Sequence, residues 1–246
     1  MSIGKDDARK FGRALAALTV LAAVLAVLFR VLPAVDLQVS RGFYSPGSGF
    51  AFAEVPAWDA VVTANKLASI LFVGTALVFL PVALLRRQHL WLRYWGFVIM
   101  LYLLGPGLLV NVTLKRLIGR ARPTQIAEFG GDGGFTAAWQ LSDYCRSACS
   151  FVSAETAVAT ALMVSLAVGA VWFAGRPVAR WFIGLACASL GLLVLTALQR
   201  LGSGRHYLSD VIFAALLVAI LALLLAGALH PRRQATSKTR TSGLAR

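Results

Sequence analysis

Three short blocks of polar residues stand at the ends of long apolar segments of this chain. They are Lys115-x(6)-Arg122-Pro123, then Ser150-Phe151-Val152-Ser153-Ala154-Glu155, then Arg200-x(5)-His206-x(3)-Asp210. Arginine presents a planar fork to phosphate oxygens and lysine a compact charge, while a histidine beside a carboxylate can act as a nucleophile. Together the blocks predict one site that binds a phosphate group and transfers it.

The first block places two cations seven residues apart. On a helix this spacing is about two turns, so Lys115 and Arg122 would share a face and converge on one anion, and Pro123 would end the helix. The alternative is that both side chains reach lipid head groups at a helix end. For Arg116 and Arg120, on other faces, we expect that head-group contact.

The second block opens an apolar segment with Ser153 and Ala154. The first turn of a helix presents unpaired N–H groups and a partial positive charge, which suits a phosphate, and the Ser153 hydroxyl adds a donor. The alternative is a helix cap, with Ser153 capping and Glu155 favoured in the first turn by the dipole.

The third block supplies a nucleophile. His206 and Asp210 are four residues apart, so on a helix they share a face, and Asp210 would accept a hydrogen bond from one imidazole nitrogen. The other nitrogen is then free to attack phosphorus, while Arg200 clamps the phosphate oxygens. Glu155 is the other carboxyl in the blocks and the candidate proton donor to the leaving oxygen. The alternative is an interfacial histidine with a carboxylate neighbour.

The composition indicates which elements must position these blocks. Of 246 residues, 59% are hydrophobic and 14% are charged, which is too apolar for an ordinary soluble domain. A helix crosses a bilayer with about 20 apolar residues. Six charge-free windows predict an all-α integral membrane protein, a six-transmembrane-helix bundle: Ala14–Phe29 (extendable to Val35), Leu67–Leu85, Tyr94–Leu114, Thr156–Gly175, Trp181–Gln199 and Val211–Leu229.

The net charge of +14 is explained by its distribution. With both termini cytoplasmic, fourteen of the 24 lysines and arginines fall inside, as the positive-inside rule expects, so we expect no nucleic-acid partner. They are Lys5, Arg9, Lys10, Arg13, Arg86, Arg87, Arg93, Arg176, Arg180, Arg232, Arg233, Lys238, Arg240 and Arg246.

This topology places segments 30–66, 115–155 and 200–210 outside, and the last two contain all three blocks. The predicted organisation is a cytoplasmic N-terminus at 1–13, a six-helix domain at 14–230 and a basic cytoplasmic tail at 231–246. The basic stretch followed by an apolar run at the N-terminus is also typical of a secretory signal peptide. We expect an uncleaved first helix.

Cys145 and Cys149 lie in the second of these outer segments. An oxidising compartment would permit a disulfide between them. A zinc site is the alternative, but it needs more nitrogen or sulfur ligands than this region offers. We expect the disulfide and no metal.

Taken together, the blocks resemble the type-2 phosphatidic acid phosphatase superfamily, the lipid phosphate phosphatases related to vanadium haloperoxidases. Its first motif, Lys-x(6)-Arg-Pro, is matched in full. Its third, Ser-Arg-x(5)-His-x(3)-Asp, is matched except that Gln199 replaces the serine. Of its second motif, Pro-Ser-Gly-His, only Ser153 is met, and Glu155 stands at the histidine position. The stretch from 119 to 153 also resembles bacterial members that act on outer-leaflet lipids, including lipid A phosphatases.

The resemblance implies a metal-independent phosphatase without a cofactor that acts through a phosphohistidine. His206 would be the nucleophile, oriented by Asp210. Four side chains would hold the phosphate, namely those of Lys115, Arg122, Ser153 and Arg200. The family's leaving-group acid is the second-motif histidine, so either Glu155 takes that role or activity is weak or absent.

The expected reaction is hydrolysis of a phosphomonoester or pyrophosphate on a lipid like phosphatidic acid, an isoprenyl pyrophosphate or lipid A. It would take place at the periplasmic face of a bacterial inner membrane, with the bilayer and the lipid as partners. Two alternatives stay open: phosphoryl transfer to another lipid, and a non-catalytic lipid-phosphate binder in which Glu155 marks lost activity. The sequence makes no prediction of oligomeric state.

Overall fold

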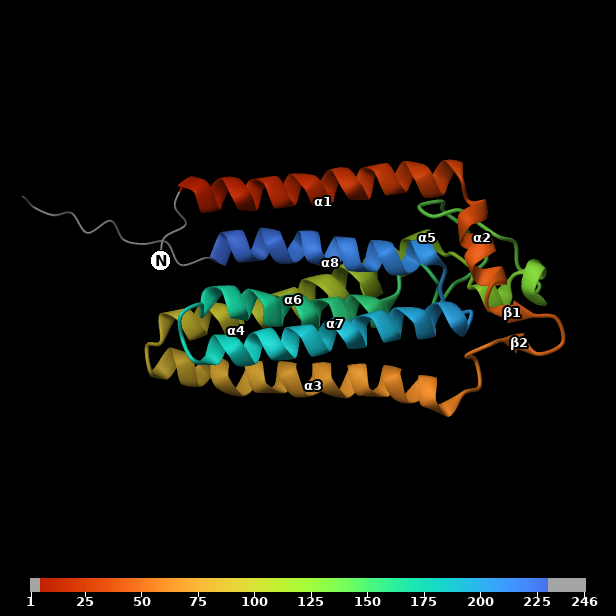
Figure 1. The fold of residues 1–246 in the computed structure, drawn as a ribbon. Coiled ribbons are helices and arrows are strands. Elements are labelled where there is room, and N and C mark those ends of the chain that lie inside the picture. The colour runs from red at the N-terminus through yellow and green to blue at the C-terminus, as the bar shows by residue number, and fades with distance from the viewer. Residues whose placement is uncertain (1–4, 230–246) are drawn as a thin grey trace, which may run out of the picture.

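The protein is an all-α bundle in a computed structural model that describes residues 5–229 (Figure 1). The predicted tail at 231–246 lies outside the described residues. The elements are α1 (Lys5–Val31), α2 (Ala34–Arg41), β1 (Tyr44–Ser45), β2 (Gly49–Phe50), α3 (Pro56–Leu85), α4 (His89–Tyr102), the π-helix η1 (Leu103–Leu114), α5 (Lys115–Ile118), the 3-10 turns η2 (Pro123–Gln125) and η3 (Ala127–Phe129), α6 (Ala154–Trp172), α7 (Val178–Gly202) and α8 (Leu208–Leu229).

Six stretches of the described chain are helical, long enough and apolar enough to cross a membrane. They are Phe11–Val31, Pro56–Leu85, His89–Gln125, Ala154–Trp172, Val178–Gly202 and Leu208–Leu229. Each predicted apolar window overlaps one of them, and only the fourth window, Thr156–Gly175, runs past the end of its helix, so the six-span integral membrane fold is confirmed. Helix α1 begins at Lys5, so residues 5–13 of the predicted N-terminal segment are part of the first helix.

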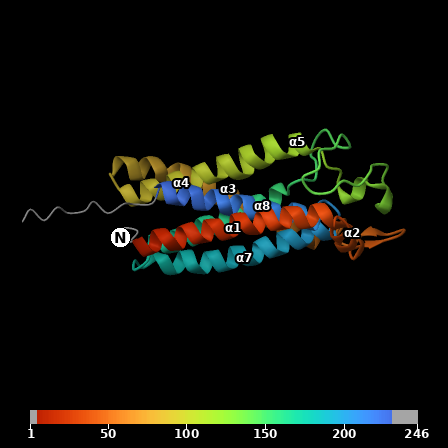
Figure 2. The ribbon, with the colours of Figure 1, turned by 90° about the horizontal axis from the view of Figure 1, so that it is seen from above.

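Helix α6 lies at the centre of the bundle. Half of its spanning window is buried inside the protein, against 6% for α1, which lies at the edge against α8. Figures 1 and 2 agree that α1 runs alongside α8. Small and hydroxyl-bearing residues such as Ala157, Thr160 and Ala161 on the buried face of α6 allow its neighbours to approach closely.

The third span is irregular and ends earlier than the sequence suggests. It contains η1 around Pro106, a residue that lacks the N–H needed for a regular helical ladder. The helix then ends at Ile118, because Gly119 adopts a left-handed conformation with φ 61°. A Cβ atom at Gly119 would collide with the carbonyl of Ser142. Pro123 therefore does not end this helix, as the sequence predicted, but begins the later turn η2.

The segments that contain the three polar blocks gather at one end of the bundle, together with α2 and the β1–β2 hairpin (Figures 1 and 2). Hydrogen bonds tie this outer layer together: the N–H of Phe52 donates to Gly202 (2.9 Å), and that of Thr124 donates to Gly204 (3.1 Å). Its apolar centre is Phe50, Ala121, Ile126, Phe129 and Tyr207. The turns between α3 and α4 and between α6 and α7 lie at the opposite end. The three blocks are therefore at one end of the molecule, as predicted.

Candidate active site

The first block reaches the site by a different route from the predicted one. Lys115 opens α5, but Arg122 lies beyond the helix end in extended backbone, with φ −78° and ψ 158°. The two cations do not share one helical face, because the chain leaves the helix at Gly119. The charges of Arg122 and Glu155 nevertheless both act on Lys115, so the three groups belong to the same end of the bundle.

The second block caps the central helix. Ser153 precedes α6, and its Oγ accepts hydrogen bonds from the N–H of Thr156 (3.3 Å) and from the Thr156 hydroxyl (2.9 Å). The capping alternative is therefore confirmed. Because Ser153 only accepts in these two contacts, its own hydroxyl hydrogen can still be donated to an anion at the start of α6. Capping and phosphate binding are compatible here.

His206 lies just before α8 and is oriented by a main-chain carbonyl. Its Nδ1 is 2.7 Å from the carbonyl oxygen of Ser150, whereas the nearest oxygen of Asp210 is 3.7 Å away. The expected hydrogen bond from the imidazole to Asp210 is thus replaced by one to Ser150. A carbonyl only accepts, so Nδ1 carries the hydrogen and the neutral ring keeps a lone pair on Nε2. The side chain is 1% exposed and faces the protein, not lipid.

Asp210 is connected to the imidazole through Ser150. It is the third residue of α8, and its Oδ2 accepts from the N–H of Tyr207 (2.9 Å), as the acidic residue of a capping box does. The same oxygen accepts from the hydroxyl of Ser150. Asp210 therefore holds Ser150, whose carbonyl in turn orients His206.

Arg120 is the largest departure from the sequence analysis. It was expected to contact lipid head groups, yet its side chain is completely buried. Its Nη1 donates to Asp210 (2.7 Å) and Ser209 (2.9 Å), its Nη2 donates to Asp36 (2.8 Å), and its Nε donates to the carbonyl of Thr136 (2.9 Å). Because α5 stops at Gly119, Arg120 turns inward, where these acceptors compensate its desolvation.

Asp36 joins the outer helix α2 to this network. Its Oδ1 accepts from the N–H of Ser209 (2.8 Å) and its Oδ2 accepts from the Ser209 hydroxyl (2.5 Å). Burial raises the pKa of Asp36 above its ordinary value, against the opposing effect of Arg120. The sequence analysis missed this residue. A lone carboxylate after an apolar span was the available signal, because such residues are costly unless they have a partner.

Glu155 faces both His206 and Arg200. Its two oxygens lie 3.6 Å from Nε2 of His206 and 3.5 Å from Nη1 of Arg200. Arg200 is held by Gln199 (2.5 Å), which also donates to Asp59 (3.3 Å). Gln199, at the position of the family serine, therefore supports the arginine. The remaining hydrogen-bonding capacity is available to a ligand, because Nε of Arg122 and Oε2 of Glu155 have no hydrogen-bond partner among the described residues.

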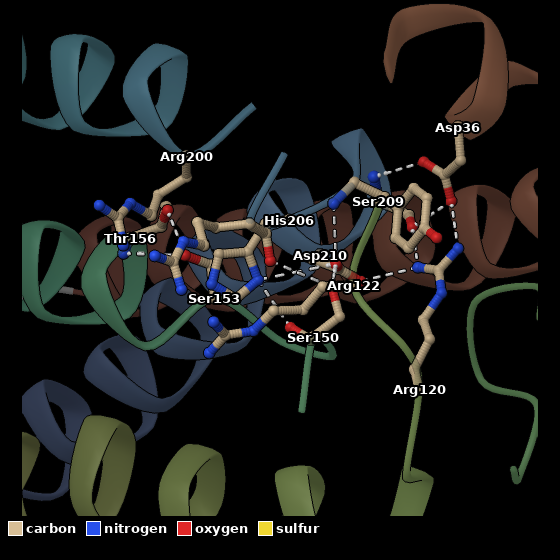
Figure 3. Close-up of polar contacts among 12 residues, drawn as sticks. Asp36, Arg120, Arg122, Ser150, Ser153, Thr156, Arg200, His206, Ser209 and Asp210 are labelled. Carbon is tan, nitrogen blue, oxygen red and sulfur yellow. Dashed lines mark hydrogen bonds and ion pairs between the residues drawn. The ribbon is translucent and has the colours of Figure 1, made fainter. Parts of the chain in front are cut away.

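Figure 3 shows the two halves of this arrangement. Arg122, Ser153 and Arg200 surround the imidazole on one side, while Arg120, Asp36 and Ser209 form the buried network on the other. Asp210 and Ser150 connect the halves. The open half carries three cations, Lys115, Arg122 and Arg200, against the single carboxylate of Glu155, which is a charge balance that favours an anion.

Cys145 and Cys149 form the predicted disulfide, with their Cα atoms 5.5 Å apart. Cys149 directly precedes Ser150, so the disulfide stands next to the residue that orients the imidazole. Within residues 5–229, no three His, Cys, Asp or Glu side chains gather as ligands of a metal ion.

The family model described as the PAP2 superfamily matches residues 91–234, a range that contains all three blocks. The chain belongs to the PAP2 superfamily. This is the type-2 phosphatidic acid phosphatase superfamily that the motifs predicted. As a PAP2 protein it departs from the second motif at Glu155, yet the structure still brings that side chain to His206.

Curated relatives of this PAP2 protein carry one printed name, lipid A 4'-phosphatase. The relative from Rhizobium leguminosarum is 43% identical over 124 residues, covering 50% of this chain and 50% of that protein. The one from Rhizobium etli is 42% identical over 124 residues, covering 47% and 45%. The one from Francisella tularensis subsp. novicida is 32% identical over 117 residues, covering 48% and 50%. The chain spans about half the length of the curated relatives it matches.

Among solved structures, the chain is similar to the first transmembrane PAP2-type phosphatidylglycerolphosphate phosphatase from Bacillus subtilis. The sequence identity is 14% and the TM-score is 0.49, over 87% of this chain and 94% of that one.

Proposed function

We propose that this protein hydrolyses a phosphate ester of a membrane lipid through a phosphohistidine on His206. The observation that carries the proposal is the hydrogen bond from Nδ1 to the Ser150 carbonyl, which leaves the Nε2 lone pair facing Glu155 and Arg200. A nucleophile with a fixed tautomer, beside three cations and a helix N-terminus, suits attack on phosphorus.

The first step forms the phosphohistidine. Nε2 of His206 attacks phosphorus while the bond from phosphorus to the lipid oxygen breaks, and the departing oxygen takes a proton from the carboxyl of Glu155. Lys115, Arg122 and Arg200 bind the three equatorial oxygens, where charge develops. The Ser150 carbonyl and the nearby Asp210 carboxylate stabilise the positively charged ring that results.

The second step returns the site to its starting state. A water molecule attacks phosphorus, the bond from phosphorus to Nε2 breaks, and the Glu155 carboxylate takes the proton of the water. Inorganic phosphate leaves, and His206 is again neutral. Glu155 thus alternates between acid and base, the pattern expected of one carboxyl that serves both halves of a hydrolysis. Acceptance of the phosphoryl group by another lipid is the alternative second step.

The proposed substrate is a phosphomonoester on a lipid A-like glycolipid. Support comes from the relatives named lipid A 4'-phosphatase, which reach 43% identity over half of this chain. Phosphatidic acid-like lipids, which are also phosphomonoesters, and isoprenyl pyrophosphate-like lipids, whose terminal phosphate is joined by a phosphoanhydride bond, are the other classes to be tested.

The proposed orientation places the site at the periplasmic face of a bacterial inner membrane, with both termini in the cytoplasm. Arg86, Arg87, Arg176 and Arg180 lie at or beside the turns at the other end of the bundle, as expected of cytoplasmic loops. In a Cys187→Ala background, Ser48→Cys in the hairpin should react with a membrane-impermeant maleimide in intact spheroplasts, and Gln88→Cys should not. The reverse labelling pattern would contradict this orientation.

The catalytic proposal is tested by phosphate release from a lipid panel with the purified full-length protein. Wild type should release phosphate, His206→Ala should not, and acid-labile labelled phosphate should appear on the wild-type protein during turnover. Label that accumulates on a lipid acceptor would instead indicate transfer. Activity that survives His206→Ala would rule out the phosphohistidine mechanism.

A further inference from the structure

A second cluster of cations shares Lys115 with the phosphate site and adds Arg116 and Arg146, two side chains that the proposed reaction does not use. Lys115, Arg116 and Arg146 line one cavity of about 650 Å³, together with Asn111, Ser147 and Ala148. That volume lies in the range of small-molecule pockets, about 300–1,000 Å³. We propose that this cavity binds a second anionic group of the same lipid head group, so that the substrate is a lipid that carries two anionic groups. The inference rests on the proposed function.

Lys115 connects the two sites. Its side chain lines the cavity, and its charge interacts with those of Glu155 and Arg122 in the phosphate site. An anion in the cavity and a phosphate at His206 would therefore share Lys115 as a neighbour. Two phosphates on one rigid sugar head group are the kind of ligand that could contact Lys115 from both sides.

No carboxylate forms a direct ion pair with the cations of the cavity within the described protein. None of Lys115, Arg116 and Arg146 takes part in an ion pair among residues 5–229, and no carboxylate lines the cavity. Like charges that line one cavity repel one another, and a bound anion reduces that cost. Arginine forks also match the oxygens of a phosphate in pairs.

The position of Arg146 is set by the disulfide loop. Arg146, Ser147 and Ala148 are the three residues between Cys145 and Cys149, which the disulfide joins. The N–H of Cys145 donates to the carbonyl of Gly119 (3.1 Å), and that of Ser150 donates to the carbonyl of Arg120 (2.9 Å). Both ends of the loop are thus attached to the chain that follows α5, which holds Arg146 over the same cavity as Arg116. The cavity is therefore formed by the disulfide loop and α5 together, and its two arginines are exposed to a ligand.

The experiment compares two substrates on the purified full-length protein in detergent: a lipid phosphomonoester with a single anionic group, and a bisphosphorylated glycolipid. Arg146→Gln and Arg116→Gln should each raise KM for the bisphosphorylated lipid about tenfold, which is about 1.4 kcal/mol of binding. Their kcat, and both constants for the singly charged lipid, should stay at wild-type values. Arg146→Lys should raise KM less than Arg146→Gln does, since lysine keeps the charge but loses the planar fork.

The matched control is Arg180→Gln, an exposed arginine at the opposite end of the bundle. It should change neither KM nor kcat for either substrate. Unfolding temperatures close to wild type would show that all variants fold. Equal losses on both substrates, or no loss on either, would overturn the inference. An effect that follows the anionic phospholipid content of mixed micelles, and not the substrate, would assign the cavity to neighbouring lipids and would overturn it as well.

A binding measurement separates failure of this inference from failure of the proposed function. His206→Ala protein should bind the bisphosphorylated lipid more tightly than the singly charged one, and adding Arg146→Gln should remove the difference. Absence of turnover with this preference intact would refute only the catalytic proposal. Normal turnover without the preference would refute only the second subsite.

Discussion

The imidazole Nδ1 of His206 lies 2.7 Å from the carbonyl oxygen of Ser150 and 3.7 Å from the carboxylate of Asp210. A main-chain carbonyl therefore sets the tautomer, and the carboxylate acts through the residue that carries it. This indirect arrangement makes the orientation of His206 depend on every group that holds Ser150 and Asp210, including the buried Arg120.

Replacement of Asp210 by asparagine should damage both stability and catalysis. The change removes one partner of a buried ion pair, which typically costs about 3–5 kcal/mol, and leaves Arg120 with only Asp36. Thermal unfolding should show the loss, and single-turnover kinetics should show slower formation of the phosphohistidine. A variant with wild-type stability would mean that the Asp210 carboxylate is not needed to hold the network.

Arg120→Lys should strongly destabilise the protein although it keeps the positive charge. The guanidinium donates to Asp36, Thr136, Ser209 and Asp210, and an ammonium group cannot reproduce that planar set. We expect a loss of about 3–5 kcal/mol in unfolding free energy, as for a broken buried pair.

The control for Arg120→Lys is Arg116→Lys, at an exposed position four residues earlier. Surface substitutions of this kind usually change the unfolding free energy by no more than about 0.5 kcal/mol. Comparable shifts in the two variants would contradict the burial of Arg120.

Glu155→Gln should reduce kcat about 10²–10⁴-fold, the range typical for loss of a general acid or base. The amide keeps the size of the side chain, which lies 3.6 Å from Nε2 of His206, but it cannot exchange a proton. Rapid-quench measurements should find both phosphorylation and dephosphorylation slowed. Glu155→His should recover part of the rate if a proton donor is the only requirement at this position. Unchanged kcat in Glu155→Gln would remove Glu155 from the mechanism.

Gly119→Ala should disturb the site from a distance. Gly119 has φ 61°, and an added Cβ would collide with the Ser142 carbonyl, so the segment that carries Arg120 and Arg122 must shift. Such left-handed strain costs about 1–3 kcal/mol. Phosphate-release assays should show a raised KM together with a lower unfolding temperature.

Gly184→Ala provides the comparison for Gly119→Ala. This glycine is helical, and its added Cβ meets no atom within 4 Å. It should be neutral or slightly stabilising. Wild-type KM and stability in Gly119→Ala would show that the helix end does not position the cations.

The sequence by itself determined the architecture and the identity of most polar groups near His206. Six apolar windows specify six spans, because the bilayer core requires apolar helices of a set length. Their order puts the three polar blocks at the same end of the bundle. Ser153 at a helix start and two cysteines with three residues between them are local patterns, and such patterns were enough to predict the disulfide and to indicate the cap.

Only the tertiary structure decided how those groups are connected. The prediction that Lys115 and Arg122 share one helical face was wrong because one left-handed glycine ends α5. For the same reason Arg120 turns inward to Asp36, 84 residues away in the chain. The partner of the imidazole is a backbone carbonyl, a group that every residue carries and that no side-chain pattern reveals. Contacts between distant segments depend on how each chain end is turned, and helical periodicity holds no information about that once the helix has ended.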